Sequence, residues 1–431
     1  MRVTPHYDRV ELARLMNGNG VVHPKYGNLL APDCVVMPQP TALQSYREYK
    51  PYYIHLSVTG RCNARCEGCI NSSITDKDAP FLFEETVPER DAKAIVRLVE
   101  NIEKKDVIIC LYGGEPLLRP GKIITLIDEL DRLPTHKHFR YMLYTNGQLL
   151  DKVIDEFPEL LSRMWLVSVS IDGTREQHNA VRPGTDLQVI ERNLELLRDR
   201  FDTHVLMWST LRERMSLFDC YSEFFYLFMR GLVDQFFWHW MEAPEPFVYF
   251  QEYMERYESD LRHILEDYRA FLETGFFLPI THINELLLYF LTGKKRGSTS
   301  CGVELQQHYD IKDGHIHACA DLSSEFTIGA IHEDGTPEIR ERDLSPLIEY
   351  KKDIGCYHCG VEAYCGGRCP VQAIISKAER LVQYCQLMRL HVSIVKEYFK
   401  DIKPLIENAG FDLQDMYDQS VMFNQFTDVT P

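Results

Sequence analysis

The chain has 431 residues, of which 45% are hydrophobic and 26% charged, as in a globular protein of one large domain or two to three smaller ones. It is acidic, with 47 Lys and Arg against 64 Asp and Glu and a formal net charge of −17. No basic run is present, which argues against nucleic acid and an anionic membrane as partners. No apolar signal core or membrane-length segment is present either, so we expect a cytoplasmic protein.

In chain order, residues 1–50 are rich in Pro, Asn, Gly and His and predict an N-terminal extension with one weak helical run at 11–16. Strand and helix patterns then alternate over 51–245. Near-continuous apolar runs predict six strands, at 53–58, 106–114, 139–147, 164–173, 204–210 and 233–241. Apolar residues at helical spacing predict helices at 91–104, 123–133, 189–200 and 217–230. This alternation is typical of parallel βαβ units, and six of them predict an α/β fold with a partial (β/α)6 TIM-like barrel.

Three further segments follow the predicted barrel. Residues 246–299 read as a helical linker. Residues 300–400 are rich in Cys and Gly and predict a small α+β domain, with short strands at 315–320 and 325–331 and a helix near 384–402. Residues 401–431 read as a C-terminal tail that lies on the surface.

The chain contains thirteen cysteines, and ten of them fall into two groups, at 62–69 and 301–385. In a long chain without an export signal, metal binding or redox chemistry explains such groups better than disulfides. The other three, Cys34, Cys110 and Cys220, stand alone and are expected to be small buried hydrophobic residues.

The first group, Cys62, Cys66 and Cys69, follows the first predicted strand of the barrel. A structural zinc ion needs four ligands, and no fourth Cys or His lies close by in the sequence, although a distant residue could supply one. Three thiolates on a short loop suit a [4Fe–4S] cluster in which one iron stays open to a ligand.

Cys-x3-Cys-x2-Cys after the first strand of a partial barrel resembles the signature of radical S-adenosylmethionine (SAM) enzymes, and the resemblance extends over residues 53 to about 241. It implies that the open iron binds the amino and carboxyl groups of SAM. Reduction of the cluster then cleaves SAM to methionine and a 5′-deoxyadenosyl radical, which abstracts hydrogen from a substrate.

Two further motifs carry this resemblance. "YGGEPLL" (112–118) is similar to the family's second-strand motif, and "SIDG" (170–173) to its fourth-strand motif. The implied SAM contacts are Gly113, Gly114, Glu115, Ser170 and Arg182, with Asp172 shaping its turn. Both motifs lie at the carboxyl ends of predicted strands, where the active sites of parallel α/β folds form, and Arg182 follows the second motif in "HNAVRPG". One position departs from the family pattern, because Gly68 stands where an aromatic residue usually precedes the third cysteine.

The second group contains seven cysteines: Cys301, Cys319, Cys356, Cys359, Cys365, Cys369 and Cys385. Together with nearby histidines they could form two zinc sites. Their spacing, however, resembles that of the SPASM domain, which follows radical SAM barrels in peptide- and protein-modifying enzymes and holds two auxiliary [4Fe–4S] clusters. By this resemblance one cluster has four ligands, Cys356, Cys359, Cys365 and Cys385. The other has three, Cys301, Cys319 and Cys369, so its fourth position falls to a substrate thiolate or to a ligand other than cysteine.

The resemblance implies a radical SAM maturase that acts on a ribosomally made peptide and forms a thioether, carbon–carbon or ether crosslink. An alternative is an anaerobic sulfatase-maturating enzyme, which forms formylglycine. Those enzymes place an aspartate directly after the cysteine equivalent to Cys319, where this chain has Ala320 and then Asp321. One residue reverses side-chain direction in an extended segment, which disfavours the alternative and leaves Asp321 as the candidate base. A non-enzymatic iron–sulfur electron carrier is a second alternative.

The expected partners are the precursor peptide and an external electron donor such as flavodoxin or ferredoxin. Only 52 residues precede the first predicted strand of the barrel, so we expect leader recognition by a separate protein or by the barrel and SPASM surfaces. In "FFWHWM" (236–241), Trp238 and Trp240 share one face of a strand and His239 the other, and core packing is the preferred interpretation of both tryptophans.

Overall fold

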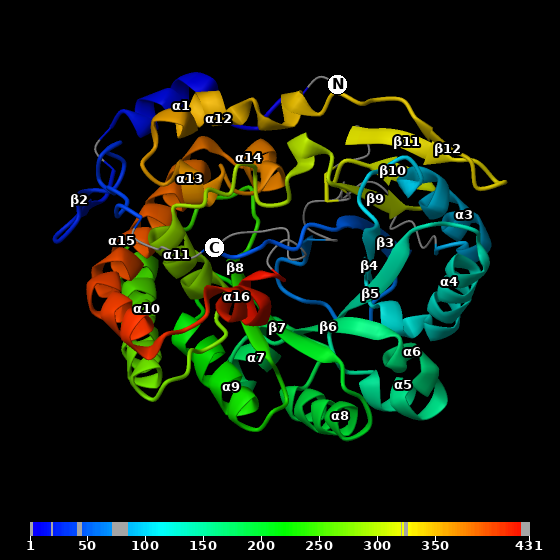
Figure 1. The fold of residues 1–431 in the computed structure, drawn as a ribbon. Coiled ribbons are helices and arrows are strands. Elements are labelled where there is room, and N and C mark those ends of the chain that lie inside the picture. The colour runs from blue at the N-terminus through cyan, green and yellow to red at the C-terminus, as the bar shows by residue number, and fades with distance from the viewer. Residues whose placement is uncertain are drawn as a thin grey trace.

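A computed structural model describes residues 3–18, 20–40, 45–70, 85–319, 321–322 and 326–423. Its centre is a sheet in which six strands run parallel in sequence order (Figure 1). These strands are β3 (Tyr52–Thr59), β4 (Asp106–Gly113), β5 (His138–Thr145), β6 (Met164–Ser170), β7 (His204–Leu211) and β8 (Gln235–Trp240). All six predicted strands are therefore confirmed, and their order and direction are those of the predicted partial barrel.

Helices cover the outer face of these strands (Figure 1). The four predicted ones are α3 (Pro88–Val99), α4 (Pro120–Arg132), α8 (Leu187–Arg200) and α9 (Leu217–Met229). Each turns an apolar stripe inward; in α3 this stripe includes Ala92, Ile95 and Val99. Three shorter helices were not predicted: α5 (Leu150–Glu156), α6 (Pro158–Ser162) and α7 (Arg175–Val181). Helices of five to seven residues are too short to show a clear apolar period.

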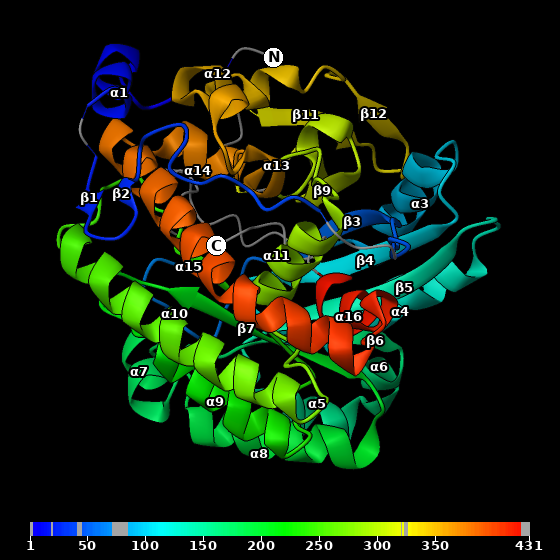
Figure 2. The ribbon, with the colours of Figure 1, turned by 60° about the vertical axis from the view of Figure 1, so that its left-hand side comes forward.

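Longer helices close one side of the barrel. The predicted helical linker forms α10 (Phe250–Glu273) and α11 (Thr281–Thr292), and α10 packs against α15 (Ala378–Ala409), as Figure 2 shows. The sequence predicted only 384–402 of α15; the helix is longer at both ends and continues past Pro404. α1 (Arg9–Met16), in the N-terminal extension, also packs against α15. None of the helices in the described ranges is long and apolar enough to span a bilayer.

The C-terminal region extends the barrel sheet. Four short strands follow one another antiparallel: β9 (His308–Lys312), β10 (His315–His317), β11 (Thr327–Ile331) and β12 (Pro337–Ile339). β9, which was not predicted, pairs parallel to β3, so one ten-stranded sheet crosses the predicted domain boundary near residue 300. Short helices lie among the remaining cysteines: α12 (Tyr350–Ile354) precedes Cys356, α13 (Glu362–Cys365) ends at Cys365, and α14 (Pro370–Ile375) directly follows Cys369.

The predicted surface tail is partly buried: residues 407–410 are exposed, whereas Met416, Tyr417, Ser420 and Phe423 are buried. After α16 (Leu413–Met416), one helical turn brings Ser420 against the end of the barrel, where its carbonyl accepts hydrogen bonds from Gln235 and Thr281. Phe423 then stacks on His204 with ring centroids 4.3 Å apart. This segment therefore closes the barrel at the end opposite the cysteine loop, because His204 and Gln235 begin their strands.

Candidate active site

The first cysteine group lies on a loop that follows β3 and borders a large cavity. The cavity has an empty volume of about 1630 Å³, and its lining includes the three predicted ligands Cys62, Cys66 and Cys69. Two backbone hydrogen bonds attach the loop to the chain around the end of α7, from Arg65 N to Pro183 O (2.7 Å) and from Glu67 N to Val181 O (2.9 Å). The loop conformation thus depends on contacts with the end of α7, in the connection between β6 and α8, as well as on β3.

Gly113 and Gly114 allow this loop to approach the end of β4. A Cβ atom at Gly114 would lie 2.2 Å from the Arg61 carbonyl oxygen, and one at Gly113 would lie 2.4 Å from that of Thr59. Both glycines also line the cavity. The sequence suggested glycine here for close approach to SAM, and the structure adds a second reason, the packing of the cysteine loop against this turn.

The other predicted contacts from strand ends differ in their placement. Ser170, the last residue of β6, lines the cavity. Glu115 is buried beside it and accepts hydrogen bonds from Leu117 N (3.0 Å), Thr145 Oγ1 (2.8 Å) and Asn146 N (2.8 Å). Burial raises the pKa of Glu115 to about 7, although these three donors favour the carboxylate. Its side chain therefore holds the ends of β4 and β5 together.

A buried ion cluster lies directly behind the cysteine loop. Asp172, which is fully buried, pairs with Arg182 Nε at 2.6 Å and with Arg212 Nη1 at 2.7 Å. Burial alone would raise the pKa of Asp172, but the two guanidinium charges hold it well below its usual value. Arg182 Nη1 lies 3.7 Å from Cys66 Sγ, and Arg212 Nε donates to the Glu67 carbonyl at 2.8 Å. Arg212, which sequence reasoning missed, is thus a direct support of the loop.

Gly68 has a structural explanation. Its φ of +63° is in the left-handed region, and a Cβ atom there would lie 1.9 Å from Met241 Sδ. Met241, directly after β8, lines the cavity with the cysteine loop. The space that an aromatic side chain would need beside the third cysteine is therefore filled by a methionine from a distant strand end.

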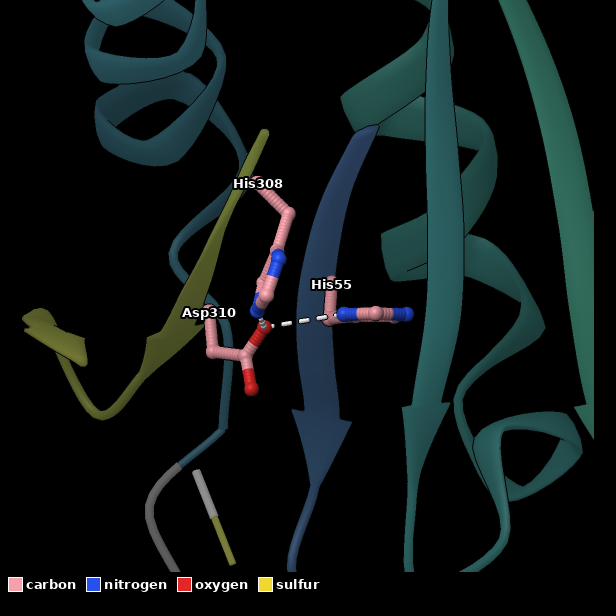
Figure 3. Close-up of side chains that lie close together, drawn as sticks. All are labelled: His55, His308 and Asp310. Atoms are coloured by element: carbon pink, nitrogen blue, oxygen red, sulfur yellow. Dashed lines mark hydrogen bonds and ion pairs between the residues drawn. The ribbon is translucent and has the colours of Figure 1, made fainter. Parts of the chain in front are cut away.

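Two histidines and a carboxylate also line the cavity, and Figure 3 shows how they lie together. The β3–β9 register places His55 opposite Asp310, and His55 Nδ1 lies 2.8 Å from Asp310 Oδ1. His308, two residues before Asp310, has Nε2 3.9 Å from the same oxygen and 3.1 Å from the Ala318 carbonyl. Because that carbonyl accepts, His308 Nε2 carries a proton. One ring nitrogen of each histidine and one carboxylate oxygen of Asp310 lie within 4.8 Å of one another, and the hydrogen bonds account for this arrangement.

Asp321 also lines the cavity. Burial, and then the nearby charge of Asp310, raise the pKa of Asp321 to about 7. The hydroxyl of Tyr112 is buried and has no hydrogen-bond partner among the described residues. Ala320, on which the comparison with sulfatase-maturating enzymes depends, lies outside the described residues.

The end of β8 supplies another polar pair. His239 Nε2 lies 2.8 Å from Thr210 Oγ1, its Nδ1 lies 3.1 Å from Glu242 Oε2, and all three residues line the cavity. Trp238 and Trp240 point the other way and are fully buried, as predicted. The sequence showed the alternation of this strand, but not that the histidine face is the cavity face.

The seven C-terminal cysteines lie in two sets. Cys301, Cys319 and Cys369, called the three-cysteine set below, line the same cavity as the first group. The other four, called the four-cysteine set, line a second cavity of about 600 Å³ that Cys369 also borders; they are Cys356, Cys359, Cys365 and Cys385. Arg389, one turn after Cys385 on α15, lies 3.3 Å from Cys359 Sγ through Nη2.

The remaining cysteines differ in their surroundings. Cys110 and Cys220 are fully buried in the core, as predicted, although Cys220 Sγ also accepts a hydrogen bond from Gln177 Nε2 at 3.5 Å. Cys34 is half-buried, and its thiol donates to the Leu29 carbonyl (3.5 Å), which also accepts from Arg389 Nη1 (2.8 Å). The N-terminal extension therefore covers the four-cysteine set.

The sulfur sets fit iron–sulfur clusters. All thirteen cysteines are free of disulfides. Burial raises the pKa of Cys369 and of Cys385 to about 12, and a metal ion bound beside them would favour their thiolate form. Sets of three, three and four sulfurs match two clusters with an open position and one with complete ligation.

Comparison with protein families identifies residues 56–212 as a match to the radical SAM superfamily. Among curated proteins, the radical SAM cyclopropyl synthase TigE of Paramaledivibacter caminithermalis is 26% identical over 182 residues, which is 36% of this chain and 37% of that protein. A serine-type anaerobic sulfatase-maturating enzyme of Bacteroides thetaiotaomicron is 29% identical over 139 residues, 31% of this chain and 32% of that protein. The matches thus span about a third of the length of these relatives.

Among solved structures, His6-tagged anSMEcpe with bound AdoMet superimposes with a TM-score of 0.63, over 87% of this chain and 99% of that one, at 19% identity. A structure of native anSMEcpe with bound AdoMet gives a TM-score of 0.61 at 20% identity. The fold match therefore extends well beyond residues 56–212 and includes the C-terminal region.

Proposed function

Because residues 56–212 match the radical SAM superfamily, we propose that the chain is a peptide maturase that uses SAM to start radical chemistry. The observation that carries the proposal is that two cysteine sets, Cys62–Cys69 and Cys301/Cys319/Cys369, line one cavity of about 1630 Å³. A cluster on the first set would supply the electron that cleaves SAM. A substrate between the two sets would then lie next to both redox groups.

The first set and its surroundings form the proposed SAM site. Cys62, Cys66 and Cys69 would hold the SAM-binding cluster. Gly113, Gly114 and Ser170 border the cavity at the adjoining strand ends and are proposed contacts of SAM. Arg182, which also lines the cavity, is held by Asp172 with Nη1 toward Cys66, and it is the proposed partner of the SAM carboxylate.

Other residues that line the cavity offer polar groups to a bound peptide. Asp321 lines the cavity close to Cys319, and we propose that it accepts the proton that the peptide loses during bond formation. The three-cysteine set leaves the fourth position of its cluster for a substrate thiolate or another ligand. The four-cysteine set has a complete ligand set, and we propose that it holds the second auxiliary cluster.

Formation of a crosslink is the favoured reaction, and formylglycine formation is the second candidate. The cyclopropyl synthase relative TigE, a bond-forming enzyme by name, supports the first, and the sulfatase-maturating relative supports the second. Both reactions remove two hydrogens from a serine-containing peptide, so mass alone does not separate them. An aldehyde-reactive hydroxylamine probe does, because it labels formylglycine and leaves a crosslink unlabelled.

The test begins with the anaerobically reconstituted protein, SAM and dithionite. We expect 5′-deoxyadenosine to form, and to be lost in Cys62→Ala, whereas Cys110→Ala, which removes a cysteine remote from the sets, retains it. Absence of 5′-deoxyadenosine from a fully loaded protein would leave only the electron-carrier function. Co-expression with small peptides encoded next to the gene, followed by mass spectrometry and the hydroxylamine probe, then identifies the product.

A further inference from the structure

Arg368 lies between the two C-terminal cysteine sets, with its charge almost unbalanced by protein. It is 6% exposed, and its three side-chain nitrogens have no hydrogen-bond partner among the described residues. Its guanidinium packs over the rings of Tyr384 (4.2 Å) and Trp240 (5.1 Å), and the Glu242 carboxylate lies 4.0 Å away. The Glu242 carboxylate also pairs with His239, whose Nδ1 lies 3.1 Å from Glu242 Oε2.

Such a placement is unfavourable in isolation. A buried cation without hydrogen bonds loses its hydration and gains only weak compensation from aromatic rings. The backbone adds to the cost, because Arg368 has φ +64°, a region that side-chain-bearing residues rarely adopt. A negative group is therefore expected beside it, and the cavity that Arg368 lines is the one formed by the four-cysteine set.

Arg389 adds a second cation to that set. It is 5% exposed, donates to Cys359 Sγ at 3.3 Å and is held by the Leu29 carbonyl at 2.8 Å. Glu362, the one carboxylate among the described residues that line this cavity, is paired with Lys351 at 2.9 Å. The four-cysteine set thus has two arginines facing it without a strong carboxylate partner.

The three-cysteine set has the opposite surroundings. Three carboxylates line the cavity that it borders, Glu242, Asp310 and Asp321. The arginines of that cavity, Arg182 and Arg212, are both paired with Asp172 behind the first cysteine loop. The two sets therefore differ in their surroundings: two arginines face the four-cysteine set, whereas carboxylates predominate around the other, although Glu242 is shared with His239 and Arg368.

We propose that Arg368 and Arg389 are positioning residues that make the cluster on Cys356, Cys359, Cys365 and Cys385 more easily reduced than the cluster on Cys301, Cys319 and Cys369. Adding an electron makes a cluster more negative, and a fixed positive charge in a low-dielectric interior stabilises that state, whereas nearby carboxylates oppose it. Arg389 borders only the four-cysteine set, while Arg368 precedes Cys369 and is expected to affect both clusters. The inference rests on the proposed function, because it requires iron–sulfur clusters on both sets.

The test is an EPR-monitored redox titration of the full-length, anaerobically reconstituted protein, with signals assigned by their loss in Cys385→Ala and Cys319→Ala. We expect the four-cysteine cluster to be reduced at the higher potential. Arg389→Met should lower that potential alone, and Arg368→Met should lower it together with a smaller shift of the other cluster. The lysine variants at both positions should recover most of the shift. Arg198→Met, which removes an arginine of the barrel helix α8, is the matched control and should change neither potential.

Iron content separates loss of a cluster from a change in its potential. If Arg389→Met or Arg368→Met loses iron, the order of potentials in the unaltered protein and the lysine variants still decide the outcome. The reverse order of potentials, or unchanged potentials in fully loaded methionine variants, would overturn the inference. A protein that cleaves SAM but shows no shift refutes only this inference, whereas a loaded protein that cleaves no SAM refutes the proposed function.

Discussion

Substitution of Gly68 by alanine should disturb the cysteine loop in two separable ways. The left-handed backbone, with φ of +63°, costs about 1–2 kcal/mol for a residue with a Cβ atom. The new Cβ atom would also lie 1.9 Å from Met241 Sδ, so the methionine must move. Its backbone is fixed by hydrogen bonds to the Leu211 carbonyl (2.9 Å) and from Arg380 Nη2 (2.9 Å). Only its side chain can respond, at a cost of about 0.5–1.5 kcal/mol for leaving its rotamer.

Together these terms amount to about 1.5–3.5 kcal/mol at the loop that carries Cys66 and Cys69. If this energy is taken from ligand binding, SAM affinity should fall by a factor of about ten to several hundred. The measurement is SAM binding to the reconstituted protein by calorimetry, with iron content as the check on cluster loading. Met241→Ala in the Gly68→Ala background should restore the part due to the clash and leave the backbone part. Wild-type affinity in Gly68→Ala, or no gain in the double variant, would refute this reasoning.

Three further predictions concern charged side chains that are paired or hydrogen-bonded within the protein. Arg212→Met leaves Asp172 paired with Arg182 alone, so the free energy of unfolding measured with denaturant should fall by about 1.5–3 kcal/mol, the cost of one charged hydrogen bond; exposed Arg214 changed to Met should have almost no effect. Asp310→Asn should retain SAM cleavage without peptide but slow peptide modification, since it removes the charge beside His55; equal loss of both activities would contradict this. Burial by itself raises the pKa of Glu397, but hydrogen bonds from the N-terminal extension and α10 lower it to about 2. The stabilising contacts of the Glu397 carboxylate with the extension are therefore present above the usual carboxyl pKa of 4.5 and lost as the pH falls toward 2. In cluster-free protein, the extension should be better protected from hydrogen exchange in the wild type than in Glu397→Gln, and this difference in protection should shrink as the pH falls over this range.

The barrel could be predicted from sequence because its signals are local. Each strand is an apolar run that ends at a loop with glycine or polar residues, and each long helix shows its own apolar stripe. β9 was missed for the same reason, because its five residues, His308–Lys312, alternate polar and apolar and have no apolar run. The pairing of β9 with β3 is a contact between residues about 250 positions apart, and hydrophobic period carries no information on such a partner.

The candidate site likewise contains residues that local sequence patterns reveal and residues that only tertiary contacts reveal. Cys62, Cys66, Cys69 and the motif glycines were found because each motif is spaced within a single loop, and the second cysteine group was found from its spacing along 301–385. His55 lay within an apolar strand pattern, and a polar residue there was the one signal that could have been followed. Its partner Asp310 required the β9 pairing, and Arg212 and Met241 come from strand ends that the cysteine motif does not include. Sequence spacing therefore predicts candidate ligands, and tertiary pairing decides which side chains support them.

The pairing of β9 with β3 has a consequence for how the two parts of the chain work together. β3 has buried residues throughout and is flanked by β4 on one side and β9 on the other, so the C-terminal region covers what would otherwise be an open edge of the barrel. The same pairing sets His55 against Asp310 and brings Cys301 and Cys319 to the cavity of the first cysteine loop. One strand contact thus completes the fold and assembles the cavity, so the C-terminal region cannot be regarded as an accessory placed on a finished barrel. A change that loosens β9 is expected to act on stability and on the relation between the two cysteine sets at once.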